Sequence, residues 1–218
     1  PAGYAFAIWG IIYLFLILFT GYQWFAWIRK RDDRELRQTG PWFALSNLAN
    51  GFWIAAWLTG NIGLSVILML VLLLSLIALT LRLRLEIRDA PVRIIAFVWW
   101  PVTIYLGWIV AATVANISVF LVSINWQGEF LAESAWAMIM VLVAAVVYIL
   151  LVYFRNMREA ALVGIWAFTA IAFKQWQNQN AIVFAALAAA LILFVAIAIH
   201  GFKNRATSPF EKIKRGEI

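Results

Sequence analysis

Aromatic and amide side chains recur at helical spacing in three apolar segments, and they are the side chains best suited to hold a ligand. Intervals of three and four residues place side chains on one face of a helix. An indole N–H or an amide finds no water inside a membrane, so each face should turn towards another helix or a cavity. The three stripes consist of Phe6, Trp9 and Tyr13; of Ser46, Asn50, Trp53 and Trp57; and of Tyr105, Trp108, Ala112 and Asn116.

The stripes allow two interpretations. In the first, Asn50 and Asn116 form hydrogen bonds across helix interfaces, and such bonds contribute on the order of 0.6 kcal/mol in membranes. In the second, the stripes line a shared pocket with aromatic walls and a few polar anchors, which suits a flat and mostly apolar ligand. Both helix packing and ligand binding are consistent with the spacing.

The elements that must position these stripes are transmembrane helices. The chain has 218 residues, of which 66% are apolar and 12% are charged, whereas a soluble domain is roughly half apolar and a quarter charged. At about 20 apolar residues per span, this composition predicts an all-α, polytopic transmembrane bundle of about seven helices. The predicted helices cover residues 4–27, 42–60, 61–81, 93–123, 134–154, 159–175 and 180–202.

Basic residues predict the orientation of these helices. Sixteen of the 17 lysines and arginines lie in the first, third and fifth connectors or in the tail, and Lys174 is the exception. Because basic connectors stay on the cytoplasmic side, the N-terminus of this chain is predicted outside and its C-terminus inside. Seven crossings are needed, since six would place the basic tail outside. Contacts with lipid head groups explain the net charge of +7 without any nucleic acid.

The sequence shows no catalytic or metal-binding constellation, so the chain is not predicted to be an enzyme. The absence of cysteine excludes disulfides and thiolate chemistry. His200 is the single histidine and therefore a weak candidate for an axial ligand to haem iron or chlorophyll magnesium; a polar residue at the membrane interface is the simpler interpretation. Acidic residues of the basic connectors, such as Glu86 and Asp89, are predicted to form solvated ion pairs that contribute little to the stability of the fold.

Two other classes of polytopic membrane protein fit poorly. A retinal Schiff base needs a lysine in the last helix, and no lysine lies between Asn180 and Phe202. An ion-coupled transporter needs ionisable residues along its pathway and helices broken near the middle of the membrane. The interiors of these spans hold no carboxylate, and Pro101 is their only proline. Transport is therefore the less favoured function.

Several motifs resemble the translocator protein family, TspO, also called the tryptophan-rich sensory proteins. The sequence PAGYAF followed by WGIIY is similar to the family's Pro-Pro-Gly-Trp-x-Phe and Trp-x-x-x-Tyr, with Ala2 and Tyr4 in place of the usual proline and tryptophan. SNLANGFW resembles the family's helix ending in Asn-x-x-Trp, and YLGWIVAATVAN resembles its Tyr-x-x-Trp followed by Ala-Thr-x-x-Asn. The resemblance covers roughly residues 1–126, which hold four helices in the family's order.

The resemblance also implies a domain organisation. Members of the family have five helices, and the four helices of residues 1–126 look like the second to the fifth. A first helix is therefore expected to precede Pro1 and is absent from this chain. Residues 127–202 would add three transmembrane helices, and residues 203–218 would form a basic cytoplasmic tail.

The resemblance implies a pocket for a tetrapyrrole (porphyrin, haem or chlorophyll) or for a sterol-like molecule. Six of the family's positions are carried over, and the stripes add two tyrosines. The predicted ligand-binding residues are Trp9, Tyr13, Asn50, Trp53, Tyr105, Trp108, Ala112 and Asn116.

We therefore expect an integral membrane protein that binds or senses a flat apolar ligand, in a bacterial inner membrane or a thylakoid-type membrane. The alternative is a structural or accessory subunit of a larger membrane complex, for example a photosynthetic, pigment-containing one. The apolar helices predicted in 127–202 favour this alternative, because they could contact a partner or a second copy of the chain as well as lipid.

Overall fold

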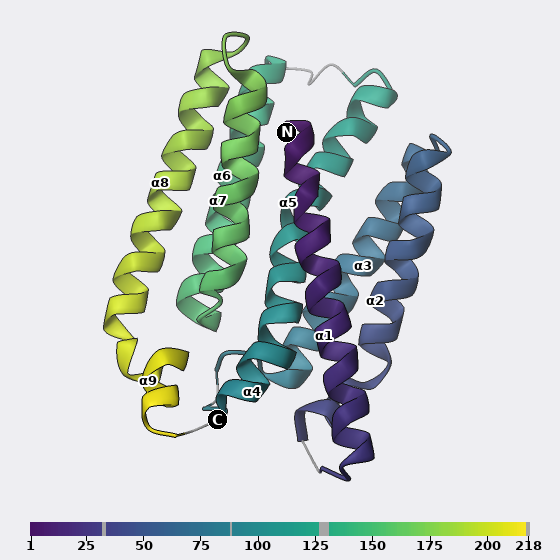
Figure 1. Cartoon of the computed structure of the whole chain (residues 1–218). Helices are drawn as coiled ribbons and strands as arrows, with labels where there is room; N and C mark the ends of the chain where they lie inside the picture. The colour runs from purple at the N-terminus through teal and green to yellow at the C-terminus, as the bar shows by residue number, and fades with distance from the viewer. Residues whose placement is uncertain (32–33, 88, 127–130, 217–218) are drawn as a thin grey trace.

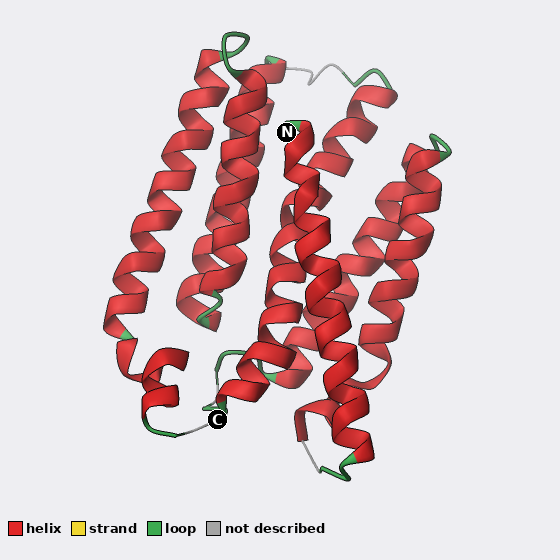
Figure 2. Cartoon of the chain, in the orientation of Figure 1, coloured by secondary structure: helices red, strands yellow, loops and turns green. Residues whose placement is uncertain are grey.

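The computed structural model describes residues 1–31, 34–87, 89–126 and 131–216, and within these ranges all regular structure is helical (Figures 1 and 2). Seven long helices form an up-and-down bundle. They are α1 (Ile8–Ile28), α2 (Arg34–Leu58), α3 (Ile62–Leu83), α5 (Trp100–Ser123), α6 (Glu133–Arg155), α7 (Arg158–Gln175) and α8 (Asn180–Lys203).

Two of these helices are extended by short segments of different geometry. The 3₁₀ turn η1 (Gly3–Ala7) leads into α1, while α4 (Val92–Ile94) and the π-helix η2 (Ile95–Trp99) lead into α5. Pro101 has no backbone N–H to donate to the carbonyl four residues earlier, and the backbone ahead of it takes the wider π geometry.

The prediction of seven helices needs one correction, because the tail also folds. After η3 (Arg205–Thr207), the chain forms a further helix, α9 (Pro209–Lys214). Ser208 and Pro209 are residue types that favour the start of a helix, and they could have predicted it. In the structure the Ser208 hydroxyl accepts a hydrogen bond from the Glu211 N–H (3.4 Å), and Pro209 occupies the first turn.

Five helical rods are long and apolar enough to cross a membrane, which makes the chain an integral membrane protein. Among the described residues, α2 and α7 do not meet this standard, although crossings were predicted for both. Helix α2 bends at Gly40 (φ 56°) after a charged first turn, and α7 has charged residues in both end turns and only 18 residues. The five rods that qualify are Gly3–Ile28, Ile62–Leu83, Val92–Ser123, Glu133–Arg155 and Asn180–Lys203.

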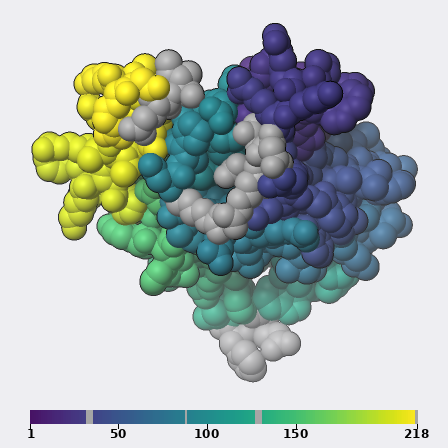
Figure 3. All heavy atoms as spheres, turned by 90° about the horizontal axis from the view of Figure 1, so that it is seen from below, coloured from purple at the N-terminus to yellow at the C-terminus, as the bar shows by residue number. Residues whose placement is uncertain are grey.

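The basic ends of the helices lie together at one end of the bundle. In Figure 1 the connectors α1–α2, α3–α4 and α6–α7 and the tail all lie at the bottom, whereas Pro1 and the connectors α2–α3 and α7–α8 lie at the top. We call these the basic end and the opposite end. Seen from the basic end, α9 lies beside the start of the α4–α5 rod (Figure 3).

Helix α7 packs against α5, α6 and α8 and leaves one face, which carries Leu162 and Phe173, exposed. Small residues allow this close packing: a Cβ on Gly107 of α5 would lie 2.8 Å from the Cα of Ala160, and a Cβ on Gly164 of α7 would lie 2.7 Å from the ring of Tyr148. The Tyr148 hydroxyl donates to the Gly107 carbonyl (2.7 Å), so α5, α6 and α7 are joined at this level.

The N-terminal segment is attached to α7. The Ala2 N–H donates to the Ala170 carbonyl (2.9 Å), and the Trp166 indole donates to the Ala5 carbonyl (3.1 Å). The Tyr4 ring also packs edge-on against Trp166, with ring centroids 5.2 Å apart. These contacts attach η1, and with it the start of α1, to α7 at the opposite end of the bundle.

Candidate functional site

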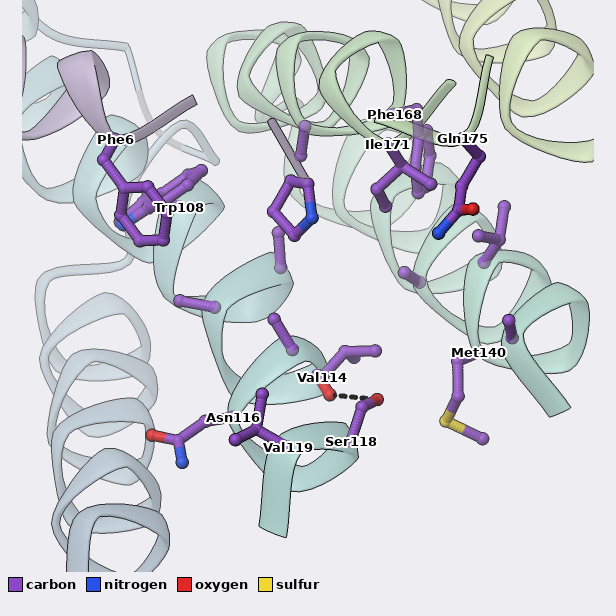
Figure 4. A pocket seen from close by; sticks show the side chains of 18 of the residues that line it. Phe6, Trp108, Val114, Asn116, Ser118, Val119, Met140, Phe168, Ile171 and Gln175 are labelled. Carbon is purple, nitrogen blue, oxygen red and sulfur yellow. Dashed lines mark hydrogen bonds between the residues drawn. The ribbon is translucent and has the colours of Figure 1, made fainter. Parts of the chain in front are cut away.

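A cavity of about 310 Å³ lies at the opposite end of the bundle, between α5 and the pair α6 and α7. Small-molecule pockets have about this size or more, roughly 300–1,000 Å³. Figure 4 shows Trp108 and Phe6 on one side, Met140, Phe168, Ile171 and Gln175 on the other, and residues of α5 between them. The lining is mostly apolar and also includes Trp9, Trp53, Trp57, Ala111, Ala112, Asn116, Ser118, Val141, Ala144 and Ala167.

A cluster of aromatic rings centred on Trp9 forms one wall. Trp9 stacks on Trp53, with centroids 5.9 Å apart and planes at 29°, and Trp53 stacks in turn on Trp57. The Trp108 ring lies edge-on to Trp9 (6.3 Å) and to Phe6 (6.0 Å). Because each ring is held by others, the wall presents a fixed aromatic surface to the cavity.

Hydrogen bonds across three helices hold this wall in place. The Trp53 indole donates to the Asn116 amide oxygen (2.7 Å), and the Asn116 amide nitrogen donates to the Ser65 hydroxyl (2.9 Å). Trp53, Asn116 and Ser65 are all buried, and they lie on α2, α5 and α3 respectively. The interhelical bond predicted for Asn116 is therefore present, and Asn116 also lines the cavity.

One polar group of the wall remains available to a ligand. The Trp108 side chain is 3% exposed, and its indole N–H has no hydrogen-bond partner among the described residues. Asn116, Ser118 and Gln175 also contribute polar groups to the lining, but Asn116 is bonded to Trp53 and Ser65, and the Ser118 hydroxyl donates to the Val114 carbonyl (2.8 Å; Figure 4). A buried indole N–H without an acceptor is unfavourable, so a guest with an acceptor on its edge would relieve that cost.

The structure separates the eight predicted residues into two groups. Trp9, Trp53, Trp108, Ala112 and Asn116 line the cavity. Tyr13, Asn50 and Tyr105 do not: Tyr13 stacks on Trp9 and is 40% exposed, Tyr105 is fully buried behind Trp9, and Asn50 is buried with an unpaired amide oxygen.

The pocket was predicted between the first, second and fourth long helices, and residues of all three line the cavity. The aromatic rings of α1, α2 and α5 pack against one another, and the space that they line extends to α6 and α7. Sequence reasoning missed this far wall, formed by Met140, Val141, Ala144, Phe168 and Ile171. Only the alanine-rich composition of these helices hinted at close packing here.

His200 lies outside this cavity. It lines a second, polar cavity at the basic end, where the Asn204 amide lies 3.3 Å from its ring nitrogen and the ring packs edge-on against Tyr153 (5.7 Å). His200 therefore cannot be an axial ligand for a molecule in the aromatic cavity. In the described part of the chain, no group of three or more histidine, cysteine or acidic side chains could hold a metal ion.

The prediction of solvated ion pairs in the basic connectors is wrong for Glu86. Burial and, after it, the neighbouring Glu159 raise the pKa of this carboxyl to about 8, against the opposing effect of Arg158. Asp89 behaves as predicted, because it is exposed and paired with Lys212, which lowers its pKa.

These features define a polytopic α-helical membrane protein with an aromatic-walled cavity in its bundle. Over residues 1–199 the sequence matches the family model described as TSPO-like protein, and the chain belongs to this family. The match extends well beyond residues 1–126, so α6, α7 and most of α8 lie inside it. The sequence matches none of the curated proteins and none of the solved structures with which it was compared.

Proposed function

We propose that the protein binds a flat, mostly apolar molecule in the aromatic cavity, with a tetrapyrrole such as porphyrin as the first candidate. One observation carries the proposal: a fixed tryptophan wall faces a mostly aliphatic wall across an open space, and the buried indole N–H of Trp108 in the first wall has no partner among the described residues. A planar ring could stack on the tryptophans while an acceptor on its edge receives that N–H.

The chemistry of the lining favours a tetrapyrrole without axial ligation by the protein. The described lining contains no histidine, and the Met140 thioether is its only sulfur. The residues therefore fit a free-base porphyrin better than a haem whose iron must be bound by a protein ligand. Trp9, Trp53 and Trp108 would hold the ring plane, and the small side chain of Ala112 leaves room for it.

Family membership supports a binding or sensory role, and the charge distribution supports an orientation. With the basic end in the cytoplasm of a bacterial inner membrane, or on the equivalent side of a thylakoid-type membrane, the cavity lies in the outer half of the bilayer. A ligand would then enter from the outer side or from the outer leaflet.

Titration with protoporphyrin tests the proposal. The purified chain is titrated in detergent, with the porphyrin's own absorption and emission as the signal, so that removal of a tryptophan does not alter the readout. Ala112→Leu fills the space beside the wall and should weaken binding at least tenfold. Trp108→Phe keeps the ring but removes the N–H, and it should weaken binding by about 0.5–1.5 kcal/mol.

Trp24→Phe is the matched control, because Trp24 is 62% exposed and lies on α1 away from the cavity. Thermal unfolding of each variant verifies that it folds. If Ala112→Leu, folded as wild type, binds porphyrin with unchanged affinity, the aromatic cavity is not the binding site.

A further inference from the structure

The second cavity, of about 310 Å³, lies at the basic end and has polar walls. Four parts of the chain form it: the α3–α4 connector, the start of the α5 rod, the α6–α7 junction, and the end of α8 with the tail. The residues that matter here are Glu86, Trp99, Trp100, Asn156, Arg158, Glu159, His200 and Lys212.

Two carboxylates in this cavity have no counter-ion among the described residues. Glu159 accepts one hydrogen bond, from the Trp100 indole (3.2 Å), while its second oxygen and one oxygen of Glu86 are buried without a partner. Arg158 stabilises the charged form of both glutamates electrostatically but forms no ion pair with either, and a Cβ on Gly201 of α8 would lie 3.3 Å from its guanidinium. Two buried carboxylates without a paired cation are unfavourable.

The buried lysine of the cavity does not neutralise them. Lys212 of α9 is 2% exposed, forms an ion pair with Asp89, and donates to the Ala90 carbonyl (2.8 Å). These contacts attach α9 to the α3–α4 connector and make it a wall of the cavity. The lysine charge is thus directed to Asp89 and not to Glu86 or Glu159.

Two further polar groups point to a ligand with both donors and an acceptor. Trp99 is only 4% exposed and lines the cavity, and its indole N–H has no partner among the described residues. The amide oxygen of Asn156 is likewise buried and unpaired. The residues that line the cavity therefore carry three buried, unpaired oxygens, on Glu86, Glu159 and Asn156, together with one unpaired N–H.

We propose that this cavity binds a primary ammonium group with a neighbouring hydrogen-bond acceptor, as found in ethanolamine and in the head group of phosphatidylethanolamine. An ammonium has three N–H donors and one positive charge; the donors match the three oxygens, and the charge would favour the ionised form of the two glutamates. The neighbouring oxygen of the ligand accepts the Trp99 N–H. Two carboxylates alone make a weak site for a hard divalent cation, which takes six to eight oxygens.

The position of the cavity suits either source of such a group. It lies at the end of the bundle that carries the basic connectors, where lipid head groups meet the protein. A free amine reaches this place from the aqueous side, and a phospholipid head group reaches it from the adjoining leaflet. This proposal is independent of the porphyrin proposal, because the two cavities share no lining residue.

Calorimetric titration of the full chain tests the proposal. The protein is kept in detergent and amine-free phosphate buffer at pH 8, and ethanolamine hydrochloride, choline chloride and potassium chloride are added in separate runs. Ethanolamine should bind at least tenfold more tightly than choline, whose nitrogen has no N–H, and more tightly than potassium. Equal affinity for all three would overturn the proposal, as would no binding of any.

Two variants localise the site, with Glu133→Gln as the control because Glu133 is an exposed carboxylate at the opposite end. Glu159→Gln removes one charge-assisted bond and should weaken ethanolamine binding at least tenfold. Trp99→Phe keeps the ring and removes only the N–H, so it remains informative if Glu159→Gln misfolds. Unchanged ethanolamine affinity in folded Trp99→Phe and Glu159→Gln overturns the assignment.

A final comparison separates the two sources. The same titration is run in nanodiscs of phosphatidylcholine with and without phosphatidylethanolamine. Weaker apparent affinity for free ethanolamine in the nanodiscs that contain phosphatidylethanolamine assigns the site to the head group, and equal affinity in both mixtures assigns it to a soluble amine.

Discussion

At the scale of single residues, the same side chain often serves both of the uses that its spacing suggested. Asn116 bonds to Trp53 and Ser65 and so joins three helices, yet it also lines the aromatic cavity. Asn50, with the same expected role, is buried away from the cavity. Helix packing and pocket formation are therefore not alternatives here, because the packed tryptophan cluster is itself the wall of the pocket.

The Asn116 bridge leads to a first prediction. Asn116→Ala leaves the buried Trp53 N–H without an acceptor, and we expect a loss of about 1–3 kcal/mol of unfolding free energy. Ser118→Ala is the control, because the Ser118 hydroxyl bonds only within its own helix. Unfolding with a denaturing detergent measures both, and equal stability of the two variants would contradict the bridge.

Glu86 gives a second prediction, on pH. Its pKa is near 4.5 in the unfolded chain and about 8 in the folded protein. The folded state thus holds the proton more tightly, so stability falls as pH rises from about 4.5 to about 8. Glu86→Gln should remove this loss and be more stable than wild type at pH 8, by on the order of a few kcal/mol, with a smaller advantage at pH 5.

The groups around Glu86 define how this prediction is measured. Glu159 and Arg158 face it from α7, His200 from α8, and the Asp89–Lys212 pair from the connector and the tail. Thermal unfolding is followed from pH 5 to pH 8 in amine-free buffer, with Glu133→Gln as the exposed control. Parallel profiles for wild type and Glu86→Gln would show that Glu86 is not the titrating group.

At the scale of elements, close approach between α5 and α7 determines how the walls of the aromatic cavity are spaced. Gly107→Ala would bring a methyl group within 3 Å of the Ala160 backbone. We expect a loss of about 1–3 kcal/mol from overpacking, measured by thermal unfolding. Gly21→Ala on α1 is the control, because a Cβ there meets nothing within 4 Å. Unchanged thermal stability of Gly107→Ala would mean that α5 and α7 can move apart at little cost in free energy.

The sequence predicted the long helices well because apolar runs and basic connectors report directly on the membrane. It also predicted the tryptophan wall, because intervals of three and four residues place Trp9, Trp53 and Trp108 each on a defined face of its own helix. The far wall was not predictable from spacing, because Ala144 and Ile171 are ordinary apolar residues until tertiary packing brings α6 and α7 opposite α5. Glu86 was misjudged because the sequence of a connector does not show that α7 and the tail cover it.

At the scale of the whole molecule, successive helices run in opposite directions, so the side of the membrane on which each connector lies can be measured. The natural chain has no cysteine, so single cysteines can be introduced without background. Asn178→Cys in the α7–α8 connector and Ala206→Cys in the tail are both at exposed positions. In intact cells, a membrane-impermeant maleimide should label Cys at 178 and not at 206. Labelling at 206 alone would contradict seven crossings, and labelling of both positions, or of neither, would contradict a crossing by α8.

The packing of α7 against three other helices has a consequence for how the protein is made. A segment with Arg158, Glu159 and Lys174 in 18 residues partitions poorly into the hydrocarbon core of a membrane by itself. Its small side chains pack against α5, α6 and α8. The insertion machinery therefore has to retain this segment beside its earlier neighbours until α8 has been synthesised. Membrane insertion of the chain thus depends on contacts between successive helices. Substitutions that weaken the packing of α5, α6 or α8 should impair the insertion of α7 first.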